Sequence, residues 1–197
     1  VRAMEQAAEG LECGMTAVLS LERDKLQSAC DQASNLGVVQ ICNYNCPGQL
    51  VISGDKAAVD KAAELALAAG ARRCLPLNVS GAFHTLLMHP AGDALREKFQ
   101  SIHFAPMRFP VLFNCLGHEM AENDTVATLL EKQVQSGVRW EVTVRRLAEL
   151  GVDAAIEIGP GRVLTGFVKK TVGNAISCYP VETAAQLQQL LCTMKGA

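Results

Sequence analysis

The sequence predicts an α/β fold in two parts. Residues 15–79 read in the order strand, helix, strand, strand, helix, strand, and the chain after His84 reads as helices separated by strands. The first order is that of two split βαβ halves, the ferredoxin-like pattern, whereas strands that alternate with helices indicate a parallel sheet. At 197 residues and 49% hydrophobic, the chain can bury one good core and a second, smaller one.

Hydrophobic spacing and turn residues define each element of the first part. Apolar and polar residues alternate over 15–21, and apolar residues recur about every three or four positions over 24–33, which predicts a strand and then a helix. Strands over 38–43 and 49–54 flank Cys46-Pro47-Gly48, so we expect an antiparallel pair joined by a turn. A helix over 56–69 ends at Gly70, and a strand over 72–79 follows it.

The same criteria divide the second part. We expect helices over 86–100, 125–136, 140–150, 163–171 and 184–193, and strands over 111–115, 154–158 and 175–180. Three strands are few for an independent parallel sheet, so we expect neighbouring strands in sequence outside these 197 residues. Residues 1–8 read as the end of a helix without an N-cap, and the first residue is Val rather than Met, which supports the same expectation.

Composition argues against two classes of function. The 18 Lys and Arg residues against 20 Asp and Glu give a net charge of −2 without a basic block, so we expect no nucleic-acid binding. No run approaches the ~18 apolar residues of a membrane span, so we expect no membrane association. The eight cysteines lie mostly in apolar runs and form no Cys-x-x-Cys pair, which predicts reduced thiols in the cytoplasm rather than disulfides or a metal site.

Gly81-Ala82-Phe83-His84 is the stretch that says most about chemistry. It lies between the strand predicted over 72–79 and a helix-like run, so the His84 side chain can project from a rigid element into a cleft. An ordinary histidine pKa of about 6.5 suits general acid/base work, although a lone histidine more often has a structural role. The chain contains no Gly-x-Ser-x-Gly turn, so it offers a base without its nucleophile. The other histidines, His89, His103 and His118, are predicted to lie at the surface.

Three further segments have both a structural and a functional interpretation. Gly159-Pro160-Gly161 precedes a helix, so it is either a tight turn, which we favour, or an anion site at the helix N-terminus. Residues 43–49 concentrate amides around a turn, which indicates Asx-type turns or a surface of an active cleft. Gln133 lies 49 positions after His84 (133 minus 84) among ordinary polar residues, which by themselves predict a solvated side chain.

Three longer segments, taken together, resemble one family of enzymes. They are residues 43–54 (NYNCPGQLVISG), 75–88 (LPLNVSGAFHTLLM) and 157–166 (EIGPGRVLTG), and they follow one another along nearly the whole chain. This combination is similar to the malonyl-CoA:acyl carrier protein transacylases. The resemblance implies an α/β-hydrolase-like large subdomain, here residues 1–14 and 80–197, with a ferredoxin-like small subdomain inserted over 15–79.

The resemblance also implies a reaction and the residues that perform it. In this family a serine on a Gly-His-Ser-x-Gly elbow takes a malonyl group from coenzyme A and passes it to the phosphopantetheine thiol of acyl carrier protein, in fatty acid biosynthesis. By motif, His84 is the histidine that activates both attacks, and Gln133 is the glutamine whose backbone carbonyl orients it. Phe83 matches a bulky residue that accompanies selection of malonyl over methylmalonyl, and Asn45 is assigned to substrate binding. The reaction implies no metal or cofactor besides the coenzyme A ester and the carrier, which are substrates.

Three parts of the family's site have no counterpart in these residues. They are the nucleophile elbow, the oxyanion-hole backbone and the arginine that binds the malonyl carboxylate; Arg2 is near the last but out of register. We therefore expect the chain alone to be inactive and the missing N-terminal segment to act as its partner. Two alternatives remain, a non-catalytic fragment that binds a carrier protein or other partner, and the acyltransferase domain of a polyketide synthase.

Overall fold

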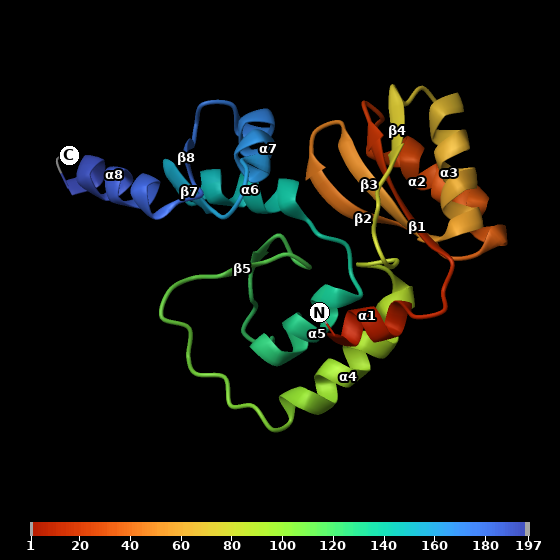
Figure 1. Cartoon of the computed structure of the whole chain (residues 1–197), viewed down its shortest axis with the longest axis horizontal. Helices are drawn as coiled ribbons and strands as arrows, with labels where there is room; N and C mark the ends of the chain where they lie inside the picture. The colour runs from red at the N-terminus through yellow and green to blue at the C-terminus, as the bar shows by residue number, and fades with distance from the viewer. Residues whose placement is uncertain (1, 196–197) are drawn as a thin grey trace. The chain divides into compact units, whose positions relative to one another are not determined.

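A computed structural model describes residues 2–195 (Figure 1). The chain divides into two compact units, Val1–Thr143 and Val144–Ala197, and each is described by itself. Helices and strands are mixed in both units, which confirms the predicted α/β class. The subdomain boundaries that the sequence predicts at 14/15 and 79/80 concern a larger fold and stay a prediction.

An antiparallel sheet of four strands forms the centre of the first unit. The strands are β1 (Cys13–Leu19), β2 (Val39–Cys46), β3 (Gln49–Asp55) and β4 (Arg73–Pro76), and helices α2 (Arg23–Ala33) and α3 (Lys56–Ala68) lead into β2 and β4. The strands lie in the order β2-β3-β1-β4, and neighbouring strands are antiparallel. The predicted order of elements over 15–79 is confirmed, but the last strand ends at Pro76 instead of residue 79, although Leu77 still donates its N–H to the Met15 carbonyl at 2.8 Å.

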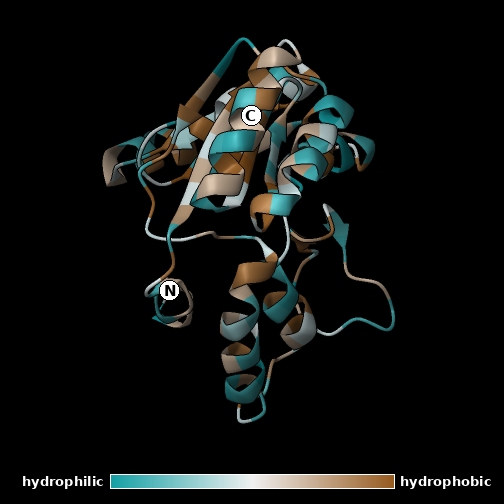
Figure 2. Cartoon of the chain, turned by 90° about the vertical axis from the view of Figure 1, so that its right-hand side faces the viewer, coloured by the Kyte–Doolittle hydropathy of each residue, from teal (hydrophilic) through white to brown (hydrophobic). Residues whose placement is uncertain are grey.

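Helices α2 and α3 pack with the sheet around the main core of the first unit. Its largest fully buried side chains include Val18 and Ile52 from the strands, Leu26 from α2 and Val59 from α3. Figure 2 shows hydrophilic and hydrophobic residues alternating around the helices, as expected for helices with one face on a core. Burying each such side chain contributes about 1.5–3 kcal/mol relative to its exposure, so this packing stabilises the sheet that carries the rest of the unit.

Glycine at position 54 allows β2 and β3 to begin their pairing. The backbone φ of Gly54 is 156°, and a Cβ there would lie 1.9 Å from the carbonyl oxygen of Val38. Because no side chain fits such an approach, only glycine is compatible with this junction.

A second, smaller apolar cluster forms around other residues of the sheet. Met15, Ala17, Cys42 and Val51 are buried together, and the half-buried ring of Phe83 packs against them. The segment that contains the predicted base is therefore attached to the sheet by its own aromatic side chain.

The remainder of the first unit consists of helices and a short hairpin joined by irregular segments. It contains α1 (Arg2–Ala8), the 3₁₀ helix η2 (Leu86–Met88), α4 (His89–Phe99), β5 (Leu112–Phe113), β6 (His118–Glu119) and α5 (Val126–Val134). The strand predicted over 111–115 as part of a parallel sheet was wrong, because β5 has two residues and pairs with β6 as an antiparallel hairpin. Gly117, with φ of 83°, donates its N–H to the Phe113 carbonyl and closes this turn.

The second unit contains a parallel pair of strands. The strands β7 (Ala154–Ile158) and β8 (Ser177–Val181) are connected through α7 (Val163–Val172), and α8 (Ala184–Lys195) follows; α6 (Trp140–Glu149) crosses the boundary between the units. Two of the three predicted parallel strands are thus present. Ile158 on β7 is 80% exposed and Ile156 is 44% exposed, although parallel sheets are normally covered on both faces.

Two further sequence predictions concern membranes and thiols. Among residues 2–195, no helix has the length and apolar character needed to cross a bilayer. All eight cysteines are free thiols, as the sequence predicts, and six of them belong to the first unit. Burial raises the pKa of the Cys42 thiol to about 12, which keeps this side chain protonated and unreactive near neutral pH.

Candidate active site

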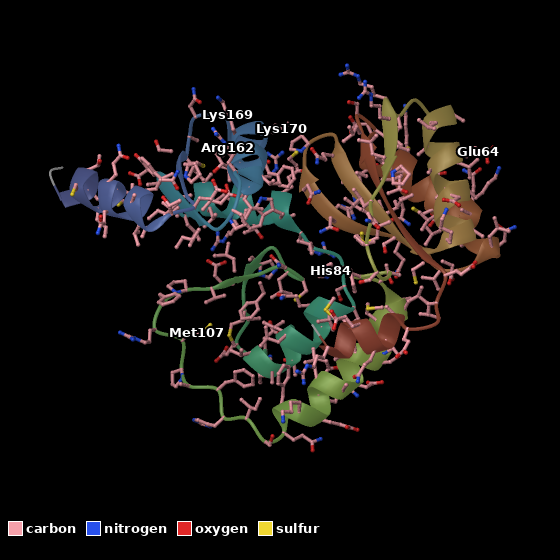
Figure 3. All side chains as sticks on the ribbon, in the orientation of Figure 1. Glu64, His84, Met107, Arg162, Lys169 and Lys170 are labelled. Atoms are coloured by element: carbon pink, nitrogen blue, oxygen red, sulfur yellow. The ribbon has the colours of Figure 1, made fainter. Side chains whose placement is uncertain are left out.

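His84 lies in a turn between β4 and η2 (Figure 3). Its backbone has φ of 62°, a left-handed conformation that residues other than glycine rarely adopt. The strand predicted over 72–79 is shorter than expected, since β4 ends at Pro76 and no strand covers residues 77–83. The helical side of the predicted junction is confirmed, because η2 begins two residues later and runs into α4.

Hydrogen bonds hold the turn around His84 in place. The buried hydroxyl of Thr85 donates to the Ala82 carbonyl at 2.6 Å and accepts the N–H of Leu87 at 3.3 Å. The side-chain oxygen of Gln40 on β2 accepts the N–H of Leu86 at 2.8 Å. The turn is thus tied both to itself and to the sheet, which offsets the cost of the left-handed backbone. Thr85 and Gln40 were not identified from the sequence. For Thr85 a signal was available, because it directly precedes a predicted helix and threonine is a common N-cap residue.

The imidazole of His84 has one fixed nitrogen and one free nitrogen. Its Nδ1 lies 2.9 Å from the backbone carbonyl oxygen of Gln133, and the side chain is partly buried. A carbonyl oxygen can only accept, so Nδ1 carries the proton in this hydrogen bond. In the neutral ring Nε2 therefore holds the lone pair, which is the state required of a general base.

The carbonyl of Gln133 is available because of its place in α5. The last four carbonyls of an α-helix have no partner inside the helix, and Gln133 lies in the last turn of α5, which ends at Val134. The backbone, and not the Gln133 side chain, makes this contact.

The structure places the other two predicted site residues on or against the sheet. Phe83 packs against the cluster of Met15, Ala17, Cys42 and Val51, which gives it a packing role besides any contact with substrate. Asn45 is half-buried on β2, just before the turn at Pro47, and its side chain makes no hydrogen bond to another described residue. A cavity of about 320 Å³ near this turn is lined by its neighbours Tyr44 and Cys46 rather than by Asn45.

The loop at Gly159-Pro160-Gly161 in the second unit is a turn whose amides already have anionic partners. The carboxylate of Glu157 on β7 accepts the N–H groups of Leu164 and Thr165 at 2.9 and 2.7 Å, at the start of α7. Glu182 accepts the N–H of Gly161 at 2.7 Å. The chain's own carboxylates occupy the helix N-terminus, so the turn interpretation is confirmed and the anion-site alternative was wrong.

The remaining titratable side chains do not form a second centre. His89, His103 and His118 are exposed, as the sequence predicts. Among residues 2–195, no group of three or more His, Cys, Asp or Glu side chains is arranged to hold a metal ion. His84 differs from these exposed histidines because it is partly buried and its Nδ1 is held by a carbonyl of another element.

Comparison with known proteins gives the family of the chain. The model of the acyl transferase domain family matches residues 2–194. The chain belongs to the acyl transferase family. A Bacillus subtilis protein named malonyl CoA-acyl carrier protein transacylase is 37% identical over 98% of the chain, and a Haemophilus influenzae protein of the same name is 39% identical over 95%. The resemblance stated from the three sequence segments is confirmed.

Solved structures of other acyl transferases have the same fold as this chain. A protein titled MCAT from Streptococcus pneumoniae is 42% identical and superposes with a TM-score of 0.91 over 98% of the chain. A structure titled PlMCAT:AntF, an acyl carrier protein of a type II polyketide synthase in complex with its malonyl-transacylase, gives 36% identity and a TM-score of 0.92. The chain spans 61% of the length of the two named transacylases and 62% of each of these structures.

Proposed function

We propose that this chain supplies the general base for transfer of a malonyl group from coenzyme A to the phosphopantetheine thiol of acyl carrier protein, in fatty acid biosynthesis. The hydrogen bond of 2.9 Å between His84 Nδ1 and the Gln133 carbonyl is the observation that carries the proposal, because it prepares Nε2 to accept a proton. Membership of the acyl transferase family and the names of the relatives supply the reaction class.

The first half of the reaction loads malonate on a serine. His84 Nε2 accepts the proton of the serine hydroxyl as the serine oxygen attacks the thioester carbonyl of malonyl-CoA. The tetrahedral intermediate then collapses, the C–S bond breaks, and the imidazolium returns its proton to the sulfur of coenzyme A. The Gln133 carbonyl stabilises the imidazolium while it exists.

The second half repeats these steps with a different nucleophile. The thiol of the carrier's phosphopantetheine gives its proton to Nε2 and attacks the malonyl-serine ester. The ester C–O bond breaks, and the serine oxygen takes the proton back from His84. Atoms and charges balance in both halves without a redox step, so we propose that no metal or organic cofactor takes part.

The serine belongs to a segment outside these 197 residues in this proposal. The sequence has no Gly-x-Ser-x-Gly turn, and the relatives are longer than the chain. We propose that this segment extends the β7–β8 sheet and also packs on the face where Ile156 and Ile158 are exposed. The result is an α/β-hydrolase-like subdomain of residues 1–14 and 80–197 with the 15–79 sheet inserted as a ferredoxin-like subdomain.

Substrate recognition completes the proposal. Phe83 limits the space for a branch on the malonyl group, and Asn45, whose amide has no partner among the described residues, contributes a polar contact. The eight free thiols are consistent with a reducing cytoplasm.

Malonyl transfer by the reconstituted protein tests this function. The chain is combined with the serine-bearing segment, and transfer from malonyl-CoA to holo-acyl carrier protein is followed by mass spectrometry, with the apo-carrier as the control that lacks the accepting thiol. We expect transfer to the holo-carrier only, and none from the chain alone. A combined protein that binds the carrier but never becomes loaded would instead favour a non-catalytic binding fragment.

A further inference from the structure

Two contacts hold the end of α5 against α4, and they flank the carbonyl that orients His84. On one side, Glu131 accepts hydrogen bonds from Arg96 Nε at 3.0 Å and from a terminal guanidinium nitrogen of Arg96 at 2.5 Å. On the other side, a Cβ at Gly92 would lie 2.6 Å from Gln135 Nε2, so α4 and α5 touch closely there. Residues 131 and 135 lie two positions before and after Gln133.

The geometry of the Arg96–Glu131 pair restricts movement of α5. Two parallel N–H···O bonds between a guanidinium and a carboxylate fix their relative orientation as well as their distance. Arg96 is itself oriented by Asp93, one turn earlier on α4, at 3.0 Å. Only 16% of the Glu131 side chain is exposed, against 58% for Asp60 and 71% for Glu64 in two ion pairs of α3, so this carboxylate is better shielded from solvent than theirs. The hydrogen bonds from Arg96 lower the pKa of the Glu131 carboxyl, which keeps the pair charged near neutral pH.

We propose that Arg96 and Glu131 are positioning residues for His84: by fixing the last turn of α5 on α4, they hold the Gln133 carbonyl at hydrogen-bond distance from Nδ1. The catalytic meaning of this inference rests on the proposed function. Neither Arg96 nor Glu131 is hydrogen-bonded to His84. A small rotation of α5 is enough to lengthen the 2.9 Å contact, and hydrogen bonds weaken steeply as their distance and angle depart from the optimum.

The test measures the hydrogen bond itself in the 197-residue chain. With ¹⁵N-labelled histidine, NMR reports which ring nitrogen of neutral His84 carries the proton and how fast the Nδ1 proton exchanges with water. We expect Nδ1–H in the wild type. R96Q and E131Q should each speed Nδ1–H exchange by up to about fivefold, the range that corresponds to loss of one ion pair at the protein surface. R96K should give a smaller increase, since lysine keeps the charge but loses the planar fork.

Matched controls separate positioning from general stability. Lys61 and Glu64 form an exposed ion pair on α3, so K61Q and E64Q remove the same kind of contact far along the chain from α5. We expect them to leave His84 exchange unchanged, while their unfolding midpoints shift as little as that of R96Q. Unchanged exchange in both R96Q and E131Q, or equal acceleration in the controls, would overturn the inference. The readout needs no malonyl transfer, so failure of the proposed function is detected separately.

Discussion

Replacing Phe83 with serine tests whether one aromatic ring both excludes branched substrates and supports the fold. The ring packs against Met15, Ala17, Cys42 and Val51 while it adjoins the base. Phe→Ala changes in cores cost about 3–5 kcal/mol, so a half-buried ring should be worth about 2 kcal/mol of unfolding free energy. Space for one methyl group is worth about 1–3 kcal/mol of discrimination, or about 10- to 200-fold in relative kcat/KM.

The two effects are measured separately. In the complete enzyme, kcat/KM is determined for malonyl-CoA and methylmalonyl-CoA in the wild type, F83S and F83L, and urea denaturation gives the stability of each. We expect F83S to raise the methylmalonyl-to-malonyl ratio, and F83L to recover most of the lost stability because it keeps an apolar side chain on the sheet. An unchanged ratio in a folded F83S protein would show that Phe83 only packs and that selection lies elsewhere.

Three further predictions concern stability and reactivity. G54A should lower the free energy of unfolding by ~3 kcal/mol or more in urea titrations, because Gly54 has φ of 156° and a Cβ there clashes with the Val38 carbonyl. G151A should cost only about 1 kcal/mol, since Gly151 has φ of 77° but open space around its Cβ position. Equal losses in the two variants would show that the clash at position 54 adds nothing to the cost of the backbone conformation. E157Q should lower the Tm at pH 7. Desolvation raises the pKa of the Glu157 carboxyl, but hydrogen bonds from Thr165 and Leu164 outweigh it and hold this pKa below its ordinary value. The stability that the Glu157 carboxylate contributes is therefore present above the unfolded-state pKa and is lost as the pH falls. The Tm difference between the wild type and E157Q should shrink as pH falls below about 4.5. Alkylation at pH 8, followed by mass spectrometry, should modify the exposed Cys192 well before the buried Cys42, whose pKa of about 12 leaves almost no thiolate; early loss of the Cys42 thiol would show that the sheet opens.

Periodicity predicted the first part of the fold well because its elements are long and their core is local. Helix α3 begins and ends within one residue of the predicted range, and β3 within one residue as well. The same reasoning failed at β5 and β6, where strands of two residues exist only through pairing with each other. Short strands carry too few residues for a periodic signal, so tertiary contacts decide them.

The candidate site was predictable only in part. The motif around His84 indicated a base, and the resemblance supplied Gln133, but no pattern in the sequence reveals that His84 adopts φ of 62°. The Arg96–Glu131 pair joins residues 35 positions apart and needs the packing of α4 on α5 before it can form. Glu157 could not be recognised as the partner of the α7 amides, because a carboxylate on a strand gives no local signal of its target.

We propose above that His84 is the base of acyl transfer and that the Gln133 backbone carbonyl orients it. The most direct test of this proposal is the rate of malonyl-enzyme formation, measured by rapid quench and mass spectrometry in the complete enzyme for the wild type, H84A and Q133A. We predict loading at least ~100-fold slower in H84A, the range for a positioned general base, and nearly unchanged in Q133A because the carbonyl remains. Loading near the wild-type rate in a correctly folded H84A protein would contradict the account.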